Sequence, residues 1–261
     1  MDLGLAGRVA IVTGASKGIG LAITQALVRE GVHVIAGARE SSSALDALQQ
    51  QGLVEHVKVD LSTQSGPLEL VAAAGTPGRV DILVNNVGAV IPSLNGFANV
   101  SDEQWSASLS LNLMAAVRTT RAVLPTMIAA GRGSIVTTSS VNAFLPDPKV
   151  IDYSAAKAAL TNFSKSLSKE VGPDGIRVNT VSPGPVATDL WLGTNGMAAS
   201  IAKADGGDAA NVAEQAAAGA ITGRFTQPHE IADLVVFLAS DRAGNITGAD
   251  FVIDGGLTTT T

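Results

Sequence analysis

The sequence predicts an α/β fold, a three-layer doubly wound (Rossmann) parallel sheet of about seven strands with helices on both faces. Two observations carry this prediction. Short apolar runs alternate with helical patterns along the 261 residues of the chain, which is typical of right-handed β-α-β crossovers. Hydrophobic residues make up 46% of the chain and charged residues only 15%, as expected where a sheet is buried on both faces.

Short apolar runs predict the strands, and runs with apolar residues at helical spacing predict the helices. The strands are expected at residues 9–12, 32–36, 54–59, 80–84, 135–138, 178–181 and 249–253. The helices are expected at residues 18–30, 41–50, in a stretch that ends near 75, and at 101–129, 153–170 and 228–239. Ser101 is the expected N-cap of the fourth helix. No linker separates these elements, so residues 1–261 are expected to form a single dinucleotide-binding domain.

Residues 187–226 interrupt this alternation. The interval is long and rich in glycine, alanine and asparagine. A long loop inside a compact domain is usually a functional lid or a disordered segment. We expect this one to be a substrate lid that becomes ordered only on binding.

Composition and charge exclude several classes of protein. The net charge of -6 carries no basic patch, so no nucleic-acid partner is expected. The chain has no cysteine, which excludes disulfides and thiolate nucleophiles. The histidines, His33, His56 and His229, lie too far apart to predict a metal site. No apolar run approaches the roughly twenty residues that span a bilayer, and residues 1–3 lack a basic leader, so we expect a cytoplasmic protein.

A glycine-rich loop with the sequence TGASKGIG, residues 13–20, lies between the first predicted strand and the first predicted helix. Backbone amides and the positive end of a helix dipole can receive a pyrophosphate at such a place. The position of the loop within a β-α-β unit favours a dinucleotide site over a merely structural turn.

Four short motifs occur in a fixed order along the chain. They are the glycine loop with Gly14, Gly18 and Gly20, the sequence NNVG at residues 85–88, Tyr153-x-x-x-Lys157, and Pro183-Gly184. With this set, the whole chain resembles the short-chain dehydrogenases/reductases. Val87 departs from the alanine that is usual in the family, and we expect little consequence. The resemblance implies an oxidoreductase that interconverts a carbonyl compound and a secondary alcohol by hydride transfer with a nicotinamide dinucleotide.

The end of the second predicted strand predicts which cofactor is used. NAD enzymes of this fold place an acidic residue there, which would repel a 2′-phosphate. This chain has Ala38 followed by Arg39, and Arg39 with Lys17 of the glycine loop could bracket a 2′-phosphate. NADP(H) is therefore the preferred cofactor. NAD(H) stays open, because Glu40 adjoins Arg39 and both cations could be solvated surface residues.

The resemblance also implies a set of cofactor-binding residues. They are Gly14, Ser16, Lys17, Gly18, Ile19, Gly20, Arg39, Asp60, Leu61, Asn86, Gly88, Tyr153, Lys157, Pro183, Gly184, Val186 and Thr188. Asp60 matches the family position near the adenine, and residues 183–188 match the segment that contacts the nicotinamide amide. Structural alternatives stay open, since Asp60 could simply cap the following helix and Gly88 could serve only a turn.

Tyr153 and Lys157 lie four residues apart at the start of a predicted helix, so their side chains face the same way. Reduction of a carbonyl needs an acid at its oxygen, and an ammonium beside a phenol lowers the pKa of that phenol. Tyr153, the only tyrosine of the chain, is therefore the expected general acid/base. In the resemblance Ser140 matches the catalytic serine, with Ser139 as the alternative, and Asn112 matches the asparagine that kinks its helix and holds a water next to the lysine.

The residues expected to wall the substrate pocket are Asn142, Phe144 and Leu145 after the fifth strand, and Trp191 and Leu192 in the lid. Most of them are apolar, which favours a neutral or moderately hydrophobic ketone, or the corresponding alcohol, over a phosphorylated substrate. The last predicted strand matches a family strand that pairs subunits in many members, so the resemblance implies a homotetramer.

Three other functions stay open. The first is 3-oxoacyl-[acyl-carrier-protein] reductase. Enzymes of that kind place basic residues near the entrance to grip the carrier protein, and two such positions are Gly131 and Asp174 here, although Arg132 and Arg177 lie close by. The second is a non-catalytic nucleotide-binding regulatory protein on the same fold. The third is an epimerase or dehydratase with the same tyrosine-lysine pair, against which the spacing of the glycines speaks.

Overall fold

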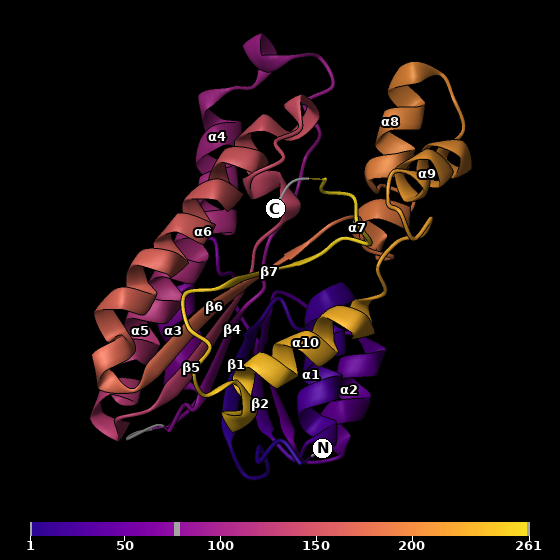
Figure 1. Ribbon diagram of the computed structural model, residues 1–261. Coiled ribbons are helices and arrows are strands. Elements are labelled where there is room, and N and C mark those ends of the chain that lie inside the picture. Colours follow the sequence, from indigo (N-terminus) through magenta and orange to yellow (C-terminus); the bar gives the residue numbers. More distant parts are fainter. Residues whose placement is uncertain (1, 76–78, 260–261) are drawn as a thin grey trace.

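The computed structural model describes residues 2–75 and 79–259 of the chain (Figure 1). Its centre is a seven-stranded sheet in the order β3-β2-β1-β4-β5-β6-β7, in which every neighbouring pair of strands is parallel. The strands are β1 (Val9–Thr13), β2 (His33–Ala38), β3 (Val54–Lys58), β4 (Ile82–Asn85), β5 (Gly133–Thr138), β6 (Ile176–Pro183) and β7 (Asp250–Ile253). The predicted doubly wound sheet is confirmed.

Helices cover both faces of the sheet (Figure 1). One face carries α1 (Gly18–Arg29), α2 (Ser43–Gln50) and α10 (Pro228–Ala239), and the other carries α3 (Gly66–Ala72), α5 (Ala115–Ala130) and α6 (Ile151–Val171). Side chains alternate along a strand, so Val136 of β5 belongs to the apolar cluster of α1 and α10, whereas Ile135 belongs to that of α5 and α6. None of the helices formed by the described residues has both the length and the hydropathy that a membrane crossing needs.

The order of the strands fixes where a ligand can bind. β1 lies between β2 and β4, so the direction of winding reverses at β1. In sheets of this kind ligands bind outside the carboxyl ends of the strands at such a reversal. The glycine loop follows β1, and residues 85–88 begin at the end of β4. The topology therefore brings two of the predicted motifs together at this edge.

The helix predicted at residues 101–129 is interrupted. α4 spans Asp102–Leu109, and the residues Ser110–Met114 between α4 and α5 form a π-helical turn. Ser101 caps α4 as predicted, because its Oγ accepts a hydrogen bond from the amide of Gln104 at 3.3 Å. A π turn inserts one extra residue into the helical ladder, and such turns are frequent at functional sites. Asn112 lies within it.

Residues 187–226 differ from the prediction, because they form helices instead of a loop without structure of its own. These helices are α7 (Asp189–Leu192), α8 (Met197–Asp205) and α9 (Ala209–Ala218), and α8 and α9 project beyond the carboxyl edge of the sheet (Figure 1). Alanine has the highest intrinsic helix propensity, so the composition that suggested a flexible lid favours helices. Asp208 caps α9 through a first-turn amide at 3.0 Å, and a parallel bridge between Val186 and Thr226 closes the base of the segment.

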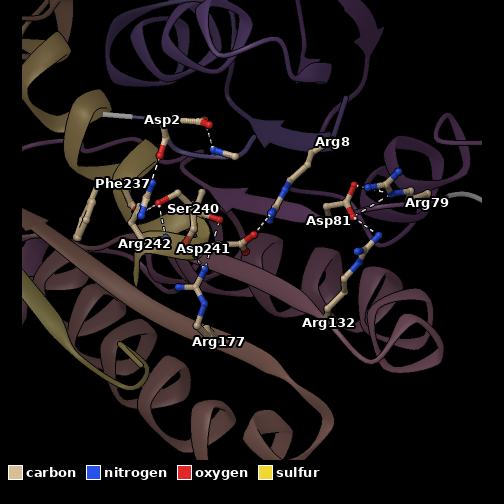
Figure 2. Close-up of polar contacts among 12 residues, drawn as sticks. Asp2, Arg8, Arg79, Asp81, Arg132, Arg177, Phe237, Ser240, Asp241 and Arg242 are labelled. Atoms are coloured by element: carbon tan, nitrogen blue, oxygen red, sulfur yellow. Dashed lines mark hydrogen bonds and ion pairs between the residues drawn. The ribbon is translucent and has the colours of Figure 1, made fainter. Parts of the chain in front are cut away.

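Arginines hold the opposite, amino-terminal edge of the sheet together (Figure 2). Arg177 at the start of β6 donates hydrogen bonds of 2.7, 3.3 and 3.0 Å to the carbonyl oxygens of residues 238–240 at the carboxyl end of α10. Arg132 and Arg79 both approach the buried carboxylate of Asp81, at 3.6 and 2.8 Å. These guanidinium groups therefore have partners within the chain and lie at the edge remote from the predicted site.

Candidate active site

Four strands and one helix bring the predicted site residues to the carboxyl edge of the sheet. The glycine loop follows β1, residues 85–88 follow from β4, Ser140 comes two residues after the end of β5, and Pro183 ends β6. α6 carries Tyr153 and Lys157 near its amino-terminal end. Residues that are far apart in the sequence thus meet at one edge.

The glycine loop leaves β1 through a turn that only glycine adopts without strain. Gly14 and Gly18 have φ angles of +68° and +55°, in the left-handed region that disfavours side chains. A Cβ on Gly20 would lie 2.1 Å from the carbonyl oxygen of Gly14. No side chain caps the first turn of α1, and Lys17 at its N-cap is exposed. The loop therefore presents backbone amides at a helix N-terminus, where an anion is stabilised.

Thr13 joins the glycine loop to the loop after β4. Its buried Oγ1 accepts hydrogen bonds from the amides of Asn86 and Val87 at 2.8 and 3.1 Å and donates to the carbonyl oxygen of Val84 at 3.2 Å. The side-chain amide of Asn86 donates in return to the carbonyl oxygen of Thr13 at 3.0 Å. The glycine motif contains Thr13 but does not indicate this role for its hydroxyl. Its only signal in the sequence is a hydroxyl residue at the end of a buried strand.

The end of β2 places Arg39 beside Asp60. Glu40 adjoins Arg39 and would disfavour a cofactor 2′-phosphate there, but it pairs with Lys58 at 2.9 Å. Among the described residues no acidic group lies within ion-pair distance of Arg39. Asp60 accepts hydrogen bonds from the amide and hydroxyl of Ser62 at 2.9 and 2.8 Å. These bonds, together with the charge of Arg39, lower the pKa of the Asp60 carboxyl.

Asp60 closes a turn, and its neighbour Leu61 packs in an apolar cluster. The hydrogen bonds of Asp60 close the turn after β3, so its carboxylate does not cap α3, which begins at Gly66. Leu61 is buried in the apolar cluster between the sheet, α3 and α5. Asp60 is exposed and Leu61 is covered.

Lys157 is a buried ammonium group whose Nζ donates to the carbonyl oxygen of Thr138, the last residue of β5, at 2.8 Å. Nζ also lies 5.6 Å from the centroid of the Tyr153 ring. Lys157 is only 3% exposed, and this burial lowers its pKa to about 8. The carbonyl group of Thr138 is a further functional group that the motifs did not indicate, because a backbone contact leaves no mark on residue type.

Burial raises the pKa of the Tyr153 phenol above its ordinary value, and the Ser140 hydroxyl opposes this in part. The net shift of the Tyr153 pKa is therefore upward, opposite to the lowering expected from a neighbouring ammonium, because the loss of hydration outweighs the hydrogen bond from Ser140. Tyr153 holds its proton at neutral pH.

Ser140 and Ser139 point to different partners. The Ser140 hydroxyl meets Asn142, with 3.2 Å between Oγ and Oδ1. The Ser139 hydroxyl lies 2.6 Å from that of Thr161 on α6 and donates to the carbonyl oxygen of Lys157 at 3.4 Å. Ser140 is thus the serine that interacts with Tyr153, whereas Ser139 fastens β5 to the middle of α6.

Asn112 stands next to the loop after β4. Its side-chain amide exchanges two hydrogen bonds with the backbone of Ala89, at 3.0 and 2.9 Å. A Cβ on Gly88 would lie 2.8 Å from Asn112 Oδ1 and 3.7 Å from Lys157 Nζ. Gly88 therefore allows the π turn and the buried lysine to approach each other, which is a stricter requirement than a turn alone.

The segment after β6 returns to the glycine loop. A Cβ on Gly18 would come within 3.3 Å of the Thr188 side chain, so the start of α1 and the start of α7 lie against each other. Gly184 has the same kind of close contact with Asp254, at 2.8 Å, and Val186 is buried at the bridge to Thr226. The predicted nicotinamide segment thus borders the predicted phosphate loop.

The predicted pocket-lining residues are partly solvent-exposed. Phe144, Leu145 and Leu192 are 44%, 46% and 50% exposed. Trp191 packs on Phe225 with 5.5 Å between the ring centroids. The apolar residues therefore stand on both the β5–α6 connection and α7, and Asn142 is the polar member of the set.

A family model described as enoyl-(acyl carrier protein) reductase matches residues 14–258. The chain belongs to the short-chain dehydrogenase/reductase family. Among curated proteins, the 3-oxoacyl-[acyl-carrier-protein] reductase FabG of Vibrio cholerae is 36% identical over 260 residues, which cover 98% of this chain and 99% of the relative. The chain is accordingly an oxidoreductase of this family.

Solved structures with the same fold include two with a bound nicotinamide cofactor. The L-sorbose reductase of Gluconobacter frateurii, complexed with NADPH and L-sorbose, is 38% identical with a TM-score of 0.92, and each chain is covered to 100%. A protein of Beutenbergia cavernae described as an NAD(P)-dependent gluconate 5-dehydrogenase, with bound NADP, is 33% identical with a TM-score of 0.88, again over 100% of both chains.

The burial of Lys157 predicts a pH-dependent effect on stability. Its pKa falls from 10.5 to about 8 on folding, so the unfolded chain binds more protons than the folded chain between these pH values. The charged lysine therefore destabilises the folded state fully below about pH 8, and this destabilisation decreases as the pH rises. The Lys157→Met variant lacks this titration. Its stability relative to the wild type should therefore decline by about 2 kcal/mol between about pH 7 and about pH 9.5, measured by urea unfolding. A difference that does not vary with pH would contradict the lowered pKa.

Proposed function

We propose that the chain is an NADP(H)-dependent oxidoreductase that interconverts a ketone and a secondary alcohol, with Tyr153 as general acid/base. The observation that carries the proposal is the arrangement of Ser140, Tyr153 and the buried Lys157 around the end of β5. An epimerase, a dehydratase or a purely regulatory protein has no support in the family comparison beyond the shared fold. The segment 187–226 is the proposed substrate lid of one dinucleotide-binding domain.

In the reducing direction the chain's own residues handle the proton. Bound NADPH would supply the hydride to the carbonyl carbon. Tyr153 donates its proton to the carbonyl oxygen, which its raised pKa allows at neutral pH. Ser140 holds the same oxygen by a hydrogen bond. The Lys157 ammonium, protonated below about pH 8, then stabilises the phenolate that Tyr153 leaves behind. A water beside Asn112 and Lys157 returns a proton from solvent in this proposal.

The cofactor site fits a 2′-phosphorylated dinucleotide. Lys17 and Arg39 are exposed cations at the glycine loop and at the end of β2, and Glu40 is drawn toward Lys58. The remaining proposed contacts follow the family motif. They are the glycine loop with Gly14, Ser16, Gly18, Ile19 and Gly20, the adenine end with Asp60 and Leu61, and the nicotinamide end with Asn86, Gly88, Lys157, Pro183, Gly184, Val186 and Thr188. Relatives whose structures contain NADPH or NADP support this choice.

The substrate proposed here is a neutral ketone, and a ketose is the first member to test. The L-sorbose reductase that supports this choice is 38% identical over the whole chain. The proposed assembly is a homotetramer and the proposed compartment is the cytoplasm.

Acyl-carrier-protein reduction is the second candidate, because the FabG of Vibrio cholerae is a relative over the full length. A carrier protein is acidic, so its docking needs free basic residues. Arg132 and Arg177 are the cations closest to positions 131 and 174, where carrier-protein reductases have basic residues. Arg132 faces Asp81, and Arg177 donates to the end of α10 (Figure 2). Both arginines lie at the amino-terminal edge of the sheet, remote from the candidate site, and this position favours a free ketone over a carrier-bound thioester.

The Tyr153→Phe substitution should lower kcat by at least about a hundredfold, because proton transfer by a positioned side chain contributes about 10²–10⁴ to the rate. Binding of NADPH, followed by fluorescence titration, should change by less than about threefold, since the hydroxyl is removed and the ring is kept. The same measurements on Ser166→Ala serve as a control, because Ser166 is an exposed hydroxyl residue of α6 outside the proposed chemistry. Equal losses of turnover and of NADPH binding in Tyr153→Phe would assign the tyrosine a structural role instead.

The Arg39→Asp substitution should shift cofactor preference from NADPH toward NADH. A cation replaced by a carboxylate repels the 2′-phosphate and can accept hydrogen bonds from ribose hydroxyls, so the ratio of kcat/KM for NADPH to that for NADH should fall by about tenfold or more. Arg29→Asp at the far end of α1 makes the same change of charge and should leave the ratio unaltered. A wild type that prefers NADH would overturn the assignment of NADP(H).

A further inference from the structure

Asn142 connects Ser140 to α6 through both ends of its side chain. The Ser140 hydroxyl donates to Asn142 Oδ1 at 3.2 Å, and the backbone amide of Asn142 donates back to Ser140 Oγ at 3.2 Å. Asn142 Nδ2 donates to the hydroxyl of Ser154 at 3.4 Å. Ser154 is buried and directly follows Tyr153 in α6. One amide therefore spans the gap between the serine and the helix turn that carries the tyrosine.

The direction of the Ser140 proton depends on this contact. A serine hydroxyl has a single proton to donate, and in the free protein that proton faces Asn142 Oδ1. A substrate carbonyl oxygen can receive a hydrogen bond from Ser140 only if the hydroxyl turns away from Asn142. The strength of the Asn142 acceptor thus controls how readily Ser140 can serve the substrate.

We propose that Asn142 is a positioning residue of the reaction. It fixes Ser140 Oγ next to Tyr153, and it releases the Ser140 hydroxyl when that hydroxyl donates its hydrogen bond to the substrate carbonyl. This role rests on the proposed function, because it assumes that Ser140 holds a carbonyl oxygen. It differs from the sequence-based expectation that Asn142 lines the substrate pocket. The hydrogen bonds of its amide go to Ser140 and Ser154, which are groups of the chain itself.

The Asn142→Asp substitution tests the proposal with almost no change of shape. A carboxylate accepts the Ser140 proton more strongly than an amide does, and it cannot donate to Ser154. We expect kcat to fall by about tenfold or more at neutral pH. We also expect activity to recover in part below about pH 5, because a protonated carboxyl regains a donor and becomes a weaker acceptor, whereas Tyr153 and Lys157 titrate at higher pH.

Asn99→Asp is the matched control, since Asn99 is an exposed asparagine of the loop before α4. It should show the wild-type rate and the wild-type pH profile. Two ketones, one without hydroxyl groups and one ketose, separate positioning from direct substrate contact. Positioning lowers kcat for both ketones to a similar degree. A rise of KM for the ketose alone, or an unchanged kcat for both, would refute the proposal.

A titration of Tyr153 tests the same contact without turnover. The chain contains one tyrosine, so tyrosinate absorbance reports Tyr153 alone. Ser140 lowers the pKa of Tyr153, and a carboxylate at position 142 withdraws the Ser140 proton and adds a negative charge. Tyr153 should therefore titrate at a higher pH in Asn142→Asp than in the wild type, and at a lower pH in Asn142→Ala, which frees the hydroxyl. The same midpoint in all three proteins would refute the positioning role even if no ketone were reduced by the wild type.

Discussion

The hydrogen bond from the buried Lys157 ammonium to the carbonyl oxygen of Thr138 fixes the helix of the proposed proton donor to the end of a central strand. A charge that is 3% exposed is costly unless polar groups surround it, and its lowered pKa records that cost. The destabilising burial of the Lys157 ammonium lies at the carboxyl edge of the sheet. The same position lets one ammonium face a phenol and the loop after β4.

The topology of the sheet and the contacts between its loops position the groups at this carboxyl edge. The reversal of winding at β1 opens the crevice, and the Thr13 hydroxyl ties the two loops on its sides together. The π turn that carries Asn112 approaches Lys157 across Gly88, where a side chain would collide. At the amino-terminal edge, arginines are bound to Asp81 and to the end of α10. The candidate site and the arginine contacts with Asp81 and with the end of α10 therefore occupy opposite edges of one sheet.

Most of the sheet and the approximate place of the site could be predicted from the sequence, because apolar strands, a glycine loop and Tyr153-x-x-x-Lys157 are local patterns. The helices of residues 187–226 were missed although the sequence contains their signals, the high helix propensity of alanine and Asp208 as a cap, because the glycines of the segment suggested a loop. The interruption at residues 110–114 was indicated only by the resemblance, in which Asn112 kinks its helix, because a π turn leaves no periodic signal in the sequence. The direction of the pKa shift of Tyr153 depends on burial, which the spacing of two residues does not reveal.

The central claim is that this edge of the sheet transfers a hydride and a proton between a dinucleotide and a ketone. The most direct measurement uses NADPH that carries deuterium at the transferable position of the reduced nicotinamide, incubated with a panel of ketoses, simple ketones and one acyl thioester. Deuterium is expected on the carbinol carbon of a ketose or simple ketone, where mass spectrometry of the alcohol would detect it. Transfer only to the acyl thioester, or no transfer of deuterium to any carbonyl in the panel, would contradict it.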